Sequence, residues 1–116
     1  MPRPLITFRG IDRSESLEGL IREKAEKLSA LYDKIDRFTV VIEEPHRHKN
    51  QGNHFHVRVT MHVPGDEIVA ARDTPKGEAE DAFFAVTHAF EVARRQLEDW
   101  HHRVRDVKRE PKAQIA

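Results

Sequence analysis

Residues 38–63 have the sequence FTVVIEEPHRHKNQGNHFHVRVTMHV and read as two extended strands joined by a polar turn. In the first arm, Phe38, Val40 and Ile42 fall on one face. The second arm alternates between polar and apolar residues from His56 to Val63. A period of two is expected when one face of a sheet is packed and the other meets water. The stretch therefore predicts a hairpin with one buried and one wet face.

Two patterns precede this hairpin. Leu5–Arg9 is a short run, partly β-branched, that stops at Gly10 and predicts a first strand. Asp12 and Ser14 are both available as helix caps. Apolar residues then recur every three or four positions across residues 17–35, Leu31 among them, which predicts an amphipathic helix.

Lys24 is the anomaly in this helix, because it lies inside the apolar stripe. One interpretation is that its stem packs on apolar neighbours while the ammonium reaches water. The other is that it faces a ligand, together with Lys27 on the same side. The residues alone leave both open.

The chain after the hairpin predicts a tight turn at Pro64 and Gly65, a fourth strand over residues 67–72, and one long helix over residues 78–107. Three acids, placed in the first turn of that helix, would complement its dipole: Glu78, Glu80 and Asp81. Three aromatic residues fall on its apolar stripe and are expected in the core: Phe83, Phe90 and Trp100. The pattern leaves Phe84 undecided.

The predicted order is β-α-β-β-β-α, with too few helices to cover both faces of a sheet. We therefore expect an α+β fold in which two helices pack on one face of a four-stranded sheet. Residues 1–107 are expected to form a single domain. Residues 108–116 form a short polar tail, which is expected to be poorly ordered.

Composition excludes several classes of function. The 20 lysines and arginines balance the 20 aspartates and glutamates, which argues against indiscriminate polyanion binding. The absence of cysteine excludes disulfides, thiolate nucleophiles and cysteine zinc sites. There is no apolar run long enough to span a membrane and no signal-peptide pattern, so a cytoplasmic protein is expected. No nucleophile motif or glycine-rich phosphate loop is present, so neither an enzyme nor a cofactor is expected.

The hairpin is rich in imidazole. His46 and His48 close one arm while His54 and His56 open the other, so the four rings could converge on a metal ion. They could instead contact RNA, remain in solvent, or gain charge on acidification, since imidazole titrates near pH 6.5.

Six segments, in this order and spacing, resemble the ribosome hibernation-promoting factor and ribosome-associated inhibitor family of bacteria. They are ITFRG (6–10), KLSALYDKID (27–36), FTVVIEE (38–44), PGDEIVA (64–70), EDAFFAV (80–86) and ARRQL (93–97). The histidine-rich stretch over residues 43–59 is similar to one branch of that family.

The resemblance implies a shape related to double-stranded RNA-binding domains and no enzymatic activity. It implies a protein that lodges in the messenger and transfer RNA channel of the small ribosomal subunit and silences translation under stress or in stationary phase. Neither DNA nor a membrane is an expected partner, and the protein is expected to be a monomer off the ribosome.

By position, Lys24, Lys27 and Arg95 match basic residues that in the family face ribosomal RNA. Arg94 is an added basic residue beside them, whereas Val92 and Asp99 stand where relatives often carry lysine. Three hairpin residues are further candidates for RNA phosphates by charge alone: Arg47, Lys49 and Arg58. The alternative hypothesis is a histidine-rich metal-binding stress protein on the same fold.

Overall fold

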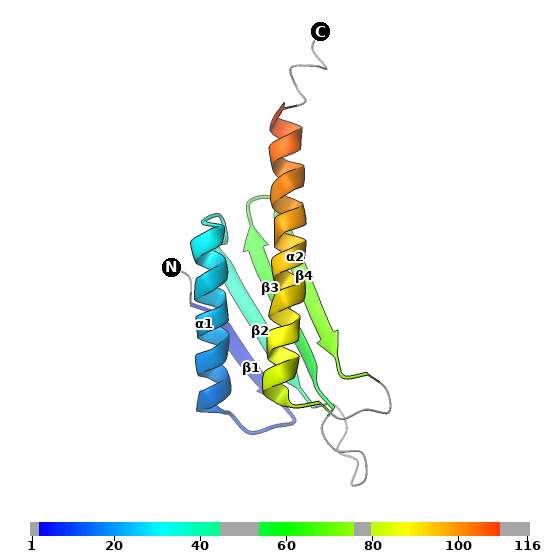
Figure 1. The fold of residues 1–116 in the computed structure, drawn as a ribbon. Coiled ribbons are helices and arrows are strands. Elements are labelled where there is room, and N and C mark those ends of the chain that lie inside the picture. The colour runs from blue at the N-terminus through cyan, green and yellow to red at the C-terminus, as the bar shows by residue number, and fades with distance from the viewer. Residues whose placement is uncertain (1–2, 45–53, 76–79, 110–116) are drawn as a thin grey trace.

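The fold is known from a computed structural model that describes residues 3–44, 54–75 and 80–109, with side chains through residue 105. The order of elements is β-α-β-β-β-α, as predicted (Figure 1). The elements are β1 (Leu5–Arg9), α1 (Glu15–Leu31), β2 (Arg37–Glu43), β3 (His56–Val63), β4 (Asp66–Asp73) and α2 (Ala82–Arg109).

The four strands form one sheet in the order β1-β2-β3-β4. β1 pairs with β2 in parallel, and the other two pairs are antiparallel. A parallel pair needs a crossover connection, which α1 supplies. Figure 1 shows α1 and α2 side by side on the same face of the sheet, running in the same direction. The α+β prediction is therefore confirmed.

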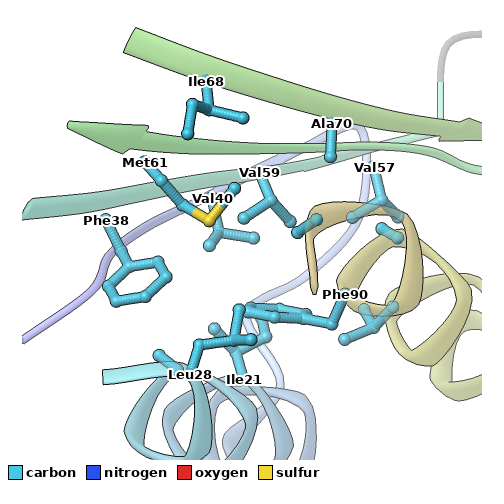
Figure 2. Close-up of a cluster of buried hydrophobic side chains, with 14 of the residues drawn as sticks. Ile21, Leu28, Phe38, Val40, Val57, Val59, Met61, Ile68, Ala70 and Phe90 are labelled. Carbon is cyan, nitrogen blue, oxygen red and sulfur yellow. The ribbon is translucent and has the colours of Figure 1, made fainter. Parts of the chain in front are cut away.

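The core lies between the sheet and the two helices. Val40 is paired with Val59, and Phe38 with Met61, and all four side chains are fully buried. Figure 2 shows these side chains pointing from the strands toward the helices. The residues between them in sequence point to the uncovered face of the sheet, as the alternation predicts.

α1 begins close to the predicted start but ends one turn before the predicted end. Ser14 is its N-cap, because the hydroxyl oxygen of Ser14 accepts a hydrogen bond from the Leu17 amide at 3.2 Å. The helix ends at Leu31, short of the end of the apolar pattern. The chain then turns at residues 33–34, and Ile35 is still buried although it no longer belongs to the helix.

The predicted start of α2 was wrong by one turn, and the acids assigned to its first turn precede it. The helix begins at Ala82. Glu80 instead pairs with Arg72 of β4 at 2.6 Å, and Asp81 accepts a hydrogen bond from the Phe83 amide at 2.6 Å. These side-chain contacts hold the two acids outside the helix, and Glu78 lies outside the described residues. At the other end, α2 continues through Arg109.

A charged cluster fixes the start of α1. Glu18 is buried and accepts from Arg13 Nε at 2.5 Å and from Arg22 Nη2 at 3.2 Å. The hydrogen bond from Arg13 holds the pKa of Glu18 below its usual value, against the opposing effect of burial. The carboxylate is thus the state that the fold stabilises.

Substitution of three glycines by alanine should change stability to different extents, because the glycines differ in backbone conformation and in the space around them. Gly10 and Gly65 both have φ of +73°, but a Cβ at Gly10 would lie 2.5 Å from the Glu44 carbonyl oxygen, whereas one at Gly65 would meet nothing within 4 Å. Gly65→Ala should lower the free energy of unfolding by about 1–2 kcal/mol, and Gly10→Ala should lower it further. Gly19→Ala, in an open helical position, should raise it by about 0.5–1 kcal/mol. Urea unfolding measures all three, and an equal loss at Gly10 and Gly65 would contradict the close approach.

Glu18 should make stability depend on pH. Its folded pKa lies below the unfolded value of about 4.3, so its contribution is complete above that pH and is lost as the pH falls through the folded pKa. Glu18→Gln should therefore be less stable than the natural protein at pH 7, and the gap should narrow below about pH 4. Urea unfolding from pH 7 to pH 3 tests this. Glu26→Gln, at an exposed position of α1, is the control and should not reproduce the effect.

Candidate functional site

The two helices border a groove of about 360 Å³. The helices lie side by side and run in the same direction (Figure 1). Each contributes one wall of the groove. The wall from α1 consists of Lys24, Lys27, Leu28 and Leu31, and the wall from α2 consists of Thr87, Phe90, Glu91 and Arg94. Three of these eight side chains carry a positive charge.

The position of Lys24 in the apolar stripe now has a structural reason. The stripe of α1 has its buried centre at Ile21, Ala25 and Leu28. Lys24 lies at the edge of this packed surface, where it is half-buried and faces the groove. Its stem can therefore pack while its ammonium stays accessible to a ligand, so the two interpretations of this residue are compatible.

The groove cations are only weakly engaged by the protein itself. Lys27 Nζ lies 3.2 Å from Glu23 Oε1, but both side chains are well exposed, and such a pair contributes little. Within the part of the chain that the structure describes, no carboxylate lies within ion-pair distance of Lys24 or Arg94. The charges of these two residues remain available to a ligand.

A carboxylate also lines the groove. Glu91 is on the α2 wall, and its Oε2 is 4.0 Å from His88 Nε2 on the same helix. The groove is therefore not a uniformly cationic surface. Its positive charge is concentrated on the α1 wall and at Arg94.

The other predicted phosphate contacts are not gathered in this groove. Arg95 is exposed on α2, but it lies one step around the helix from Arg94 and outside the groove. Arg58 is exposed on β3, in register with Val41 and Ala71, on the sheet face that the helices leave uncovered. Arg47 and Lys49 lie outside the described residues. The structure thus brings together Lys24, Lys27 and Arg94.

Of the four hairpin histidines considered as metal ligands, His54 and His56 lie in the described part of the chain. The Nδ1 atom of His56 is hydrogen-bonded to Asp73, its cross-strand neighbour on β4. His54 is half-buried just before β3, while His46 and His48 lie outside the described residues. Among residues 3–44, 54–75 and 80–105, no cluster of three or more histidine or carboxylate side chains is arranged to hold a metal ion. The four-histidine metal site stays a hypothesis.

Sequence periodicity misplaced two apolar side chains. Phe90 and Trp100 are buried as predicted, but Phe83 is 44% exposed and Leu31 is 61% exposed. Phe83 belongs to the first turn of α2 and Leu31 to the last turn of α1, where less of the fold covers the helices. Phe84, which was undecided, is exposed and stacks on His88 with ring centroids 4.9 Å apart. No pattern in the sequence singled out Thr87 or Glu91 as residues of a binding groove.

Comparison with known proteins identifies the family. A family model described as sigma 54 modulation protein / S30EA ribosomal protein matches residues 5–105. The chain belongs to this family. The S30EA match runs from β1 to the late turns of α2 and so includes both walls of the groove. It confirms the family resemblance seen in the sequence, while the histidine-rich branch stays a prediction. A search of curated proteins found no match.

Two solved structures share the S30EA fold. One is a ribosomal subunit interface protein from Coxiella burnetii, with a TM-score of 0.69 and 19% identity over 85% of this chain and 97% of that one. The other is the N-terminal domain of Protein Y from Thermus thermophilus, with a TM-score of 0.68 and 13% identity over 86% of this chain and 99% of that one.

In the described part of this chain, no helix has the length and apolar character needed to cross a membrane.

Proposed function

We propose that this protein binds the small ribosomal subunit in the messenger and transfer RNA channel and silences translation when growth slows. It acts by occupying the channel and not by catalysis. The chain belongs to a family whose description includes a ribosomal protein, and this membership supports the ribosome as the partner. The observation that carries the RNA contact is the groove in which Lys24, Lys27 and Arg94 converge.

The distribution of charge supports the helix face as the RNA-binding face. A second groove, of about 350 Å³, lies between β4 and α2, and three acids line it: Asp66, Glu67 and Asp99, opposed by Arg103. RNA phosphates are repelled there and attracted to the groove between the helices. A chain of zero net charge can therefore bind a polyanion in one orientation.

The two positions that depart from lysine-bearing relatives lie away from the proposed contact. Val92 is half-buried and packs against the core. Asp99 lines the groove beside β4. Because neither residue lines the groove between the helices, the loss of lysine at these positions leaves its three cations in place.

The two other described candidates for RNA contact, Arg95 and Arg58, lie outside the groove. Arg95 lies beside the groove on the exposed surface of α2, where it can add a phosphate contact. Arg58 lies on the face of the sheet that the helices leave uncovered, so it does not belong to the same surface as Lys24. We therefore assign the principal contact to the groove cations.

Reversal of two groove charges tests the proposal. Lys24→Glu with Lys27→Glu should weaken co-sedimentation with isolated small subunits by tenfold or more. Replacement of both by glutamine should lower the slope of log affinity against log salt by about 1–2, since each phosphate contact contributes about 0.7–0.9. The measurement is pelleting across a salt series, with circular dichroism to verify folding.

The matched control is Arg9→Glu with Arg37→Glu, which removes the same charge from the uncovered sheet face. Equal losses in both pairs would contradict the placement of the contact. Failure of the natural protein to pellet at low salt would overturn the proposed function. A parallel series with a chelator examines the metal hypothesis, because binding through the ribosome contact should not respond to it.

A further inference from the structure

The groove between α1 and α2 has an apolar surface as well as charge. Leu28 and Phe90 are nearly covered and form its floor, while Leu31 is 61% exposed at its side. Exposed aliphatic surface costs roughly 25 cal/mol per Å² relative to burial. It also contributes nothing to phosphate neutralisation. An RNA backbone alone would leave this part of the groove unused.

The chemistry of the walls defines the ligand that would use all of them. Lys24, Lys27 and Arg94 suit phosphate oxygens. Leu31 suits a flat apolar ring, and Glu91 suits a group that donates a hydrogen bond, such as an exocyclic amine or a ribose hydroxyl. A nucleotide carries all three groups. The volume, about 360 Å³, falls in the range of small-ligand sites, roughly 300–1,000 Å³.

Duplex RNA cannot present these groups together. Its bases are stacked inside the helix, and its major groove is too deep and narrow for side chains to read. Only an unpaired base that is turned out of the stack can reach the floor of a groove between two packed helices. Protein contacts to unpaired bases typically combine stacking or apolar contact with hydrogen bonds to the base edges.

We propose that the groove between α1 and α2 holds one unpaired RNA nucleotide, with its base against Leu31 and its phosphates between Lys24, Lys27 and Arg94. This inference rests on the proposed function for RNA as the partner. It adds that the contact is with a single-stranded nucleotide and not with a duplex backbone. An acidic peptide helix, which would lay only its apolar face into the groove, is the competing occupant, and the peptide arm of the experiment below tests it.

Leu31 supplies the decisive variant because the chain offers a matched control. Leu31→Ala should weaken binding of a fluorescent eight-nucleotide single-stranded RNA by about three- to tenfold, given the apolar contact that is lost. Its slope against salt should not change, since no charge is removed. Leu5→Ala should have no effect, because Leu5 is exposed to a similar extent, at 63%, but lies on edge strand β1.

The same experiment separates charge from base contact. Lys24→Gln should weaken binding of the single strand and of a duplex of equal length and should lower the salt slope for both. Leu31→Ala should affect the single strand alone. Fluorescence anisotropy at low salt measures all combinations of protein and probe.

Three outcomes would overturn the inference. They are a preference for the duplex, equal effects of Leu31→Ala and Leu5→Ala, and Leu31-dependent binding of an acidic leucine-containing peptide without binding of RNA. Pelleting with small subunits distinguishes this inference from the proposed function. If Leu31→Ala pellets like the natural protein and single-strand preference is absent, the nucleotide inference fails alone. If the natural protein does not pellet, the ribosome proposal fails.

Discussion

The structure depends on the packing of a single sheet face. Val40, Val59 and their neighbours on β2 and β3 present one apolar surface, and both amphipathic helices must be buried against it. Because the helices share that face, they lie side by side (Figure 1). The groove between them is a direct result. The candidate binding surface is therefore a product of the core.

The fold was readable from sequence because its signals are local. Alternation across residues 38–63 predicts the hairpin, and three- or four-residue spacing predicts the helices. Lys24 stood out because a charge interrupted an apolar stripe. The opposite wall of the groove was not readable, because periodicity does not state how far one helix is shifted or rotated against another. Glu91 therefore looked like any exposed glutamate, and Arg58 was grouped with the other cations by charge although it lies on the far face of the sheet.

The exposure of Leu31 and Phe83 shows that sequence periodicity is also limited in predicting which apolar side chains are buried. Both keep the spacing of core residues, yet each lies in a terminal turn where part of its surroundings is solvent. Helical periodicity predicts which side of a helix a residue faces. It does not predict how much of the fold covers the residue at its position along the helix axis. The acids before α2 were misplaced for a related reason, because their side chains cap the helix and pair with β4 instead of continuing the helical pattern.

The length of α2 gives the molecule a narrow end and a broad end. Trp100 is its last fully packed side chain, and the helix continues to Arg109. His101 still lies against Tyr32 and Val104 packs against the core, so residues 105–109 extend beyond these contacts as a single rod about 7 Å long. Figure 1 shows this part of α2 projecting beyond the sheet. The projecting rod has a cross-section far smaller than that of the two-layered body, so the molecule tapers. In a confined passage, a tapered body has a preferred leading end and a depth at which its broad end stops.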